Sequence, residues 1–259
     1  MSLITFIPTD ALKPYVRLLA ISEVTQEMEY KVLPGTSLVM GFQYRGHLST
    51  IENTAIKPLE TAGITGLQDK FRVFQNSKNI GTVLVFFNET GAACFFREPM
   101  NELFGESVSL ENFVSKSSLN EIEESLSEAQ TNQERITIIE QFLMARIQPI
   151  QADALVQSAI HQIQLAKGNI RITQLARQLY TSKSPLEKRF RRIVGASPKK
   201  FASIVRFNAL LKDYDLEKTL TELGYEAGYF DQAHFIHDFK VFTGETPEEY
   251  FEKNALRNL

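Results

Sequence analysis

Residues 228–250 read Gly-Tyr-Phe-Asp-Gln-Ala-His-Phe-Ile-His-Asp-Phe-Lys-Val-Phe-Thr-Gly-Glu-Thr-Pro-Glu-Glu-Tyr, and a related pattern lies 49 residues earlier. Upstream of it, residues 172–175 recur as residues 220–223 at an offset of 48, so the second copy has one extra residue in its turn. The capping and stop residues of each copy predict a short helix, a turn, a second helix that ends in glycine, and a third helix that begins with Ser/Thr-Pro. The repeated positions are Leu186, Phe190, Gly195, Pro198 and Phe201 in the first copy and Phe235, Phe239, Gly244, Pro247 and Tyr250 in the second.

The repeat predicts two helix-turn-helix units at about residues 172–194 and 220–243, joined by a long helix from residue 202 to about 214. Helical spacing predicts buried stripes and leaves the N-terminal halves of the second helices exposed, with Ser182 and Asp231 as N-caps. That half of such a helix reaches base edges in the major groove. The predicted stripes are Leu186, Phe190 and Ile193, and Phe235, Phe239 and Phe242; the predicted base-facing residues are Ser184, Glu187, Lys188, Gln232, Ala233 and His237.

The charge of the chain is divided along its length. The formal net charge is −3, which taken alone argues against a nucleic-acid partner. Residues 168–212, however, carry eleven Lys and Arg against one Glu, whereas residues 213–259 carry four against eleven Asp and Glu. A local basic field of this kind is typical of a surface that meets phosphates, although a solvated charged face gives the same count.

Phosphate contacts are predicted on the basic side of the first unit, with backbone N–H groups at the Ser182 helix terminus as further donors. Arg189 and Arg192 lie beside the buried stripe, so either a structural or a phosphate role fits them. The predicted phosphate-contacting residues are Ser182, Lys183, Arg191, Arg192, Lys199 and Lys200.

Residues 172–252 resemble the two-unit DNA-binding domain of AraC-type transcriptional regulators. The most specific stretch is Gly-Tyr-Phe-Asp-Gln-Ala-His-Phe at residues 228–235, followed by Phe-Lys, Gly, Thr-Pro and Tyr. More weakly, residues 33–37, 96–104 and 136–147 resemble a sensor-type N-terminal domain found with such regulators. The resemblance implies an effector-binding or dimerising domain of β-barrel character.

Three features depart from the family pattern. His237 replaces the usual Arg, so a fully charged fork for guanine or phosphate is missing. Tyr180 stands where the first turn commonly has Gly, which is awkward if that position needs a positive φ. Acidic residues surround the second reading helix. We therefore expect the first unit to supply most of the phosphate affinity and the second to read weakly, through Gln232 and a partly charged His237.

The N-terminal half predicts a different architecture. Segments 15–23, 37–44, 71–75 and 80–88 are rich in Val, Leu, Phe and Ile and are separated by turn signals, which favours a sandwich or barrel. Helical spacing follows near residues 119–147, with a break near residues 131–132 and a stop at Pro149. The predicted fold is therefore α+β: a β-barrel-like or sandwich-like domain with a helical hairpin at 1–150, then an all-α domain of two helix-turn-helix units at 151–259.

The sequence also allows several other functional sites, but for each of them a purely structural interpretation is favoured or a needed residue is missing. The Cys94 thiol with His47 could form a nucleophile and base, but a small core residue is the simpler reading of Cys94. His234 and His237 have a metal-compatible spacing without an evident third ligand. The Phe-rich strand at 83–87 is read as core, with a ligand pocket as the alternative. The carboxylates Glu121, Glu123, Glu124 and Glu128 are read as a solvated helix face.

These observations predict a sequence-specific DNA-binding transcriptional regulator that is not an enzyme and uses no cofactor or metal. The alternative is a ligand- or protein-binding regulator with a degenerate helix-turn-helix domain, which the acidic second unit favours. With one cysteine, no secretion signal and no long apolar run, we expect a cytoplasmic protein without a membrane partner. Expected partners are double-stranded promoter or operator DNA, RNA polymerase, a small-molecule effector and a second copy of the chain.

Overall fold

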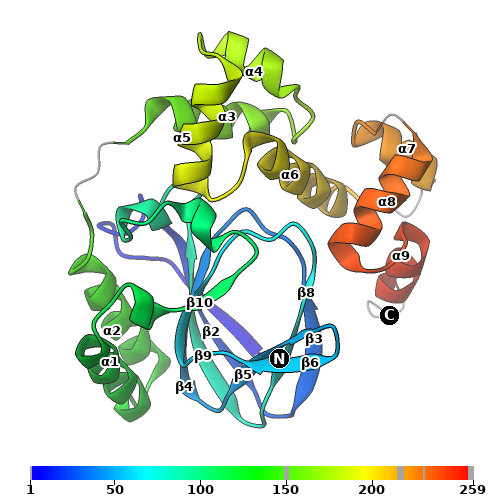
Figure 1. The fold of residues 1–259 in the computed structure, drawn as a ribbon. Helices are drawn as coiled ribbons and strands as arrows, with labels where there is room; N and C mark the ends of the chain where they lie inside the picture. The colour runs from blue at the N-terminus through cyan, green and yellow to red at the C-terminus, as the bar shows by residue number, and fades with distance from the viewer. Residues whose placement is uncertain (1, 149–151, 215–218, 230, 256–259) are drawn as a thin grey trace.

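The computed structural model describes residues 2–148, 152–214, 219–229 and 231–255 (Figure 1). A β-rich N-terminal part carries two antiparallel sheets, and an all-helical part follows it. The predicted α+β class is confirmed, and so is the order of the two parts. In Figure 1 the helices α3 to α6 lie above one end of the sheets, and α7 to α9 lie beside them.

The two sheets use ten strands in the described part of the chain. The six-stranded sheet has the order β1-β2-β9-β4-β7-β10, and the four-stranded sheet has the order β3-β8-β5-β6. The strands are β1 (Ser2–Phe6), β2 (Val16–Val24), β3 (Met28–Val32), β4 (Val39–Arg45), β5 (Leu48–Glu52), β6 (Ala55–Pro58), β7 (Ala62–Thr65), β8 (Arg72–Asn76), β9 (Ile80–Phe87) and β10 (Ser107–Ser109).

The strand predictions at 15–23, 37–44, 71–75 and 80–88 are confirmed as β2, β4, β8 and β9. Val83, Val85 and Phe87 are fully buried, which makes this strand part of the core as read from the sequence. The sequence missed six strands. Strand β3 does alternate apolar residues (Met28, Tyr30, Val32) with Glu29 and Lys31, so its signal was present in the sequence. Strand β6 is four residues long and all exposed, and it carries no such alternation.

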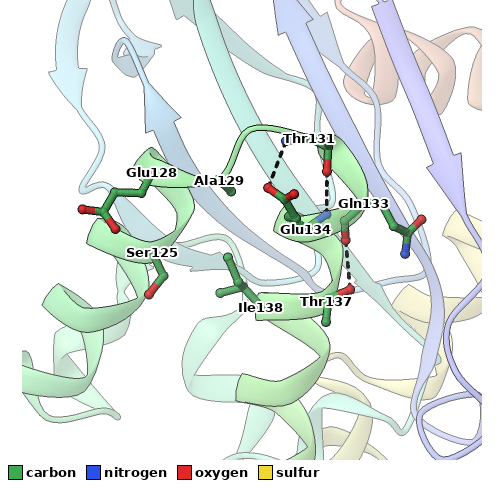
Figure 2. A pocket seen from close by; sticks show the side chains of 8 residues that line it. All are labelled: Ser125, Glu128, Ala129, Thr131, Gln133, Glu134, Thr137 and Ile138. Atoms are coloured by element: carbon green, nitrogen blue, oxygen red, sulfur yellow. Dashed lines mark hydrogen bonds between the residues drawn. The ribbon is translucent and has the colours of Figure 1, made fainter.

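A helical hairpin covers one face of the six-stranded sheet. It consists of α1 (Lys116–Glu128) and α2 (Asn132–Met144), and three short 3-10 helices precede it: η1 (Ala92–Cys94), η2 (Met100–Leu103) and η3 (Leu110–Asn112). The predicted break lies at Thr131, which caps α2 in a reciprocal capping box with Glu134 (Figure 2). The predicted stop at Pro149 is wrong for α2, because the helix ends at Met144; Pro149 itself lies outside the described residues.

The helical part contains α3 (Ala154–Leu165), α4 (Ile172–Gln178), α5 (Lys183–Val194), α6 (Pro198–Lys212), α7 (Leu220–Glu226), α8 (Gln232–Thr243) and α9 (Pro247–Ala255). The helix α6 joins the two units as predicted, although it begins at Pro198 rather than residue 202. Asp153 caps α3 and also accepts two hydrogen bonds from the Arg189 guanidinium, both at 2.7 Å. The sequence left either a structural or a phosphate-binding role open for Arg189, and this contact with Asp153 gives it the structural one.

The two units repeat each other in atomic detail. The rings of Phe190 and Phe201 meet edge to face at 5.5 Å, and the equivalent rings of Phe239 and Tyr250 do so at 5.4 Å. Gly195 (φ 93°) ends α5 and Gly244 (φ 78°) ends α8, both in the left-handed conformation that the sequence predicts. The following helices begin alike: the Ser197 hydroxyl accepts the N–H of Lys200, and the Thr246 hydroxyl accepts that of Glu249.

The turn inside each unit requires one residue with a positive φ. In the second unit that residue is Gly228 (φ 77°), and its equivalent in the first unit is Tyr180 (φ 52°). Both donate their N–H to the carbonyl three residues back, Tyr180 to Arg177 and Gly228 to Tyr225. Tyr180 thus holds a left-handed conformation without glycine's freedom, and its side chain is 99% exposed.

Three details of the reading helices differ from the sequence prediction. The buried stripe of α5 is Leu186, Phe190 and Val194, and Ile193 is only half-buried. Ser182 occupies the N-cap position, but its hydroxyl accepts no capping hydrogen bond. The stripe of α8 and its Asp231 cap are confirmed.

One hydrophobic core runs through both parts of the chain. It extends from the sheets and α1–α2 through α3, α4 and α5 to the first residues of α6. The C-terminal end of α5 packs on η2, and a Cβ added to Gly195 would lie 3.1 Å from the Met100 carbonyl oxygen. The second unit has a cluster of its own around Phe207, Phe235 and Phe239. The predicted boundary near residue 150 stays a prediction, and residues 149–151 lie outside the described residues.

Because the core is shared, a cavity in the first unit should destabilise the N-terminal part as well. Phe190→Ala removes a fully buried ring, and we expect the free energy of unfolding to fall by about 3–5 kcal/mol. Leu165→Ala, at a side chain 72% exposed, should change it by about 0.5 kcal/mol or less. Urea unfolding followed by the tyrosine signal and by circular dichroism measures both. An N-terminal part that unfolds at its original midpoint in Phe190→Ala would show that the cores are independent.

Tyr180→Gly should stabilise the chain, because it gives the first turn the residue that the second turn already has. The gain expected from relieving the left-handed conformation is about 0.5–1 kcal/mol after the added freedom of the unfolded chain is subtracted. Tyr225→Gly is the matched control: this tyrosine is also exposed but lies inside α7, so about 1 kcal/mol should be lost. Equal losses in the two variants would contradict the strain assigned to Tyr180.

Candidate nucleic-acid interface

The N-terminal halves of α5 and α8 are open to solvent. On α5, Ser184 and Lys188 are exposed, and Glu187 is half-buried with its carboxylate 3.8 Å from the Lys183 ammonium. On α8, Gln232, Ala233 and His237 are all exposed. The structure therefore brings the predicted base-facing residues together on two equivalent helix faces. Ile236, which lies next to His237 on α8, is half-buried and packs on the hydrophobic cluster of the second unit.

The basic residues of the first unit fall into two groups. Some hold carboxylates: Lys183 pairs with Glu187, and the Lys200 ammonium lies 2.9 Å from the Asp69 carboxylate of the N-terminal part. The others are exposed, and among the described residues they form no ion pair. This second group includes Lys188, Arg191, Arg192 and Lys199, together with Arg177 on α4. The free hydroxyl of the exposed Ser182 lies at the start of α5.

The second unit presents a different electrostatic surface. Asp238 faces inward, where it accepts a hydrogen bond of 3.4 Å from the Arg206 guanidinium and lies 3.7 Å from the His234 ring. Arg206 also covers the Tyr229 ring at 4.2 Å. Asp238 is therefore used to join α8 to α6, and it does not add charge to the exposed face. His234 belongs to the same structural contact.

Both reading helices place their C-terminal ends against the N-terminal part. For α5 the contact is the packing of Gly195 on Met100. For α8 the Lys31 ammonium donates to the Thr243 carbonyl at 3.1 Å and to the Glu245 carboxylate at 2.9 Å, while the Phe71 ring packs on Gly244. Lys31 and Lys253 lower the pKa of Glu245. With their C-terminal ends held in this way, both helices point their N-terminal halves away from the sheets.

The structure gives no support to the enzymatic and metal readings. Burial raises the pKa of the half-buried Cys94 thiol, which disfavours the thiolate that a nucleophile needs. Among the residues that the structure describes, no three His, Cys, Asp or Glu side chains come together as metal ligands. In the same described ranges, none of the helices has the length and apolar character needed to cross a bilayer.

A wide hollow of about 680 Å³ opens between the end of α1 and the start of α2 (Figure 2). The charged residues that line it are both acidic, Glu128 and Glu134, and the Glu134 carboxylate already accepts a hydrogen bond of the capping box. The apolar stripes of both helices, including Leu126 and Ile139, are already buried inside the chain. This hairpin therefore braces the sheet, and its outer surface is polar.

Several residues of the interface could not be found from the sequence. Lys31, Asp69 and Met100 contact the helical part from positions more than 90 residues away. No local pattern marks them, since a contact between distant segments depends on the whole fold. The positive φ at Tyr180 was detectable, because its alignment with Gly228 in the repeat identifies the position.

Two family models match the chain. A helix-turn-helix domain model, of the AraC type, matches residues 175–253. A model described as a domain of unknown function matches residues 4–109. No curated protein matches the chain.

Solved structures with a similar arrangement of elements have low sequence identity to this chain. ToxT from Vibrio cholerae is 13% identical over 96% of this chain and 98% of its own, with a TM-score of 0.45. ToxT with a bound unsaturated fatty acid is 12% identical over 90% and 93%, again at 0.45. The AraC-like transcriptional activator CuxR is 15% identical over 82% and 86%, at 0.26. At these values the neighbours do not decide what this chain binds.

The repeated helix-turn-helix geometry and the family model agree on the same residues. The exposed reading helices supply the surface that such a domain uses on DNA. The chain carries an AraC-type helix-turn-helix domain, the DNA-binding domain of transcriptional regulators, behind a β-rich N-terminal domain.

Proposed function

We propose that this regulator recognises double-stranded promoter DNA by placing α5 and α8 in successive major grooves. The observation that carries the proposal is the equivalence of the two exposed helix faces, each on a helix that ends at a left-handed glycine and is followed by an equivalent aromatic pair. The 15 residues of α6 form a spacer of about 22 Å between the units. Successive grooves lie about 34 Å apart, a span that the spacer and the widths of the two units can reach together.

We assign the base contacts to the exposed N-terminal halves and the phosphate contacts to the basic flank of the first unit. Lys200 and Lys183 are held by carboxylates in the free protein, so they contribute once a phosphate replaces those partners. The proposed base-facing residues are Ser184, Glu187, Lys188, Gln232, Ala233 and His237; the proposed phosphate contacts are Ser182, Lys183, Arg191, Arg192, Lys199 and Lys200.

The two units are proposed to contribute unequally. The exposed cations Lys188, Arg191 and Lys199 lie in or directly beyond α5, whereas α8 offers an amide, a methyl group and a histidine on its reading face. Counterion release scales with the number of phosphates neutralised, so the first unit should supply most of the affinity. The second unit should add sequence preference.

The N-terminal domain is proposed to sense an effector. The polar outer surface of α1–α2 supports a bracing role for the hairpin over pairing between chains, so a homodimer would need another surface. We place the protein in the cytoplasm with promoter DNA and RNA polymerase as partners, since a regulator acts where promoters are transcribed.

Selection from a random DNA pool with the full-length protein tests the function. We expect enrichment of a motif with two boxes about one helical turn apart, because two reading helices are held by one rigid spacer. Sequencing of the bound pool at low and moderate salt measures it. No enrichment at low salt would contradict the proposal, and a motif with a single box would contradict the role of α8.

The asymmetry predicts different losses from single substitutions on the selected DNA. Lys188→Ala should weaken binding by about tenfold or more, and Arg191→Gln should reduce the salt slope by about 1. His237→Ala should change the affinity by less than about threefold. Lys78→Ala, at an exposed lysine of the N-terminal domain, is the control. Fluorescence anisotropy across a salt series gives the constants, and equal losses for Lys188→Ala and His237→Ala would contradict the unequal model.

A further inference from the structure

A second cavity, of about 250 Å³, lies in the N-terminal domain. Met40 on β4 forms part of its lining, and this face of β4 also carries Phe42, whose ring meets that of Phe142 on α2 at 5.6 Å. The cavity is therefore outside the space between the two sheets, under α2 and beside the 3-10 segments. The lining residues that matter for its chemistry are Phe95, Phe96, Phe113, Phe142, Arg146 and Gln148.

The aromatic walls are fixed by contacts among themselves and with the core. Phe96 and Phe113 meet edge to face at 5.0 Å. Phe95 contacts the rings of Tyr15 and Phe87 at 5.8 and 5.4 Å. Since these rings are held on more than one side, the cavity is preformed and does not need to open around a ligand.

Arg146 places a cation at this aromatic lining. Its guanidinium lies 3.9 Å from the centre of the Phe142 ring and donates one hydrogen bond of 3.2 Å to the Phe142 carbonyl. In the described part of the chain it forms no ion pair with a carboxylate. Burial lowers its pKa, and no acidic neighbour offsets that effect. A partly buried cation without an anionic partner is costly, and a bound anion would therefore be stabilised beside the Arg146 guanidinium.

We propose that this cavity binds a small organic carboxylate with an aromatic or otherwise apolar body. The carboxylate would accept two parallel hydrogen bonds from the Arg146 fork, and the Gln148 amide could donate a third. The body would lie among the rings of Phe95, Phe96 and Phe113. At about 30 Å³ per water molecule, the space holds roughly eight water-sized groups, which suits an acid near the size of phenylacetate.

The cavity lies where an occupant would bear on the DNA-binding units. The Gln148 amide N–H donates to the Cys94 carbonyl at 2.8 Å, and its side-chain amide to the Phe95 carbonyl at 3.5 Å. Cys94 ends η1, and α5 packs on η1 and η2. One wall of the cavity is Phe95, which directly follows the η1 helix on which α5 packs. Another wall is Gln148, which hydrogen-bonds to the end of η1. This regulatory role rests on the proposed function; the binding site does not.

Binding to the full-length protein without DNA tests the site. The probes are phenylacetate and 4-phenylbutyrate, with phenylacetamide as the neutral match for the first. Saturation-transfer NMR and thermal unfolding should show saturable binding of at least one acid and none of the amide. Arg146→Gln should weaken acid binding about 10- to 100-fold, because a charge-assisted pair is lost. Arg17→Gln, at an exposed arginine on β2, should leave it unchanged.

Val114→Phe gives an independent variant, since Val114 lines another wall of the cavity and a larger side chain should block the acid. Circular dichroism of both variants without ligand checks that they fold. Binding of neither acid, equal binding of acid and amide, or native-like binding by Arg146→Gln would overturn the proposal. DNA binding is measured on the same preparations. Acid binding without DNA binding would support the acid site and contradict the proposed function. DNA binding without acid binding would support the proposed function and overturn the acid site.

Discussion

The packing of α5 on the 3-10 helix at Met100–Leu103 is the contact on which the arrangement of the molecule depends. It joins a β-rich domain to the first helix-turn-helix unit through one continuous core, so the reading helix is positioned by the N-terminal domain as well as by its own unit. Hydrophobic packing of this kind has little tolerance for shifts, because side chains fill the interior at high density. The direction of α5 is therefore set before any DNA is met.

The second unit is attached by weaker means. Its core around Phe207 and Phe239 is separate, and its contacts with the sheets include the Lys31 ammonium and the Phe71 ring. Exposed ion pairs contribute about 1 kcal/mol or less, so this attachment is easier to release than that of the first unit. The unit with the firmer attachment is also the one with the exposed cations. Position and charge therefore both support the proposal that the first unit supplies most of the affinity for DNA.

Local rules predicted the parts of the fold that are decided locally. The caps at Asp231 and Ser197, the glycine ends of α5 and α8 and the hairpin break at Thr131 all follow from short-range hydrogen bonding and φ preferences. Strand β6 was missed because its four residues carry no period-two pattern, whereas β3 alternates Met28, Tyr30 and Val32 with Glu29 and Lys31 and was detectable.

The candidate site divides in the same way. Exposure of Lys188 and His237 follows from helical spacing, since residues three and four apart share a face. The pairing of Lys200 with Asp69 could not be predicted, because it depends on how two domains meet. The proposed ligand contact of Arg146 could not be predicted from the sequence either. It depends on the aromatic rings around the guanidinium and on the absence of a carboxylate partner among the described residues.

The shared core has a consequence for how the chain can be dissected. A fragment starting at α3 would keep both helix-turn-helix units but would expose to water the end of α5 that Met100 covers. Such a fragment should be less soluble and less stable than its helix content suggests. The weaker seam falls along α6, where one hydrophobic cluster ends near Ala202 and the other begins at Ile204. In its packing, this regulator divides within its second domain, between one reading helix and the other.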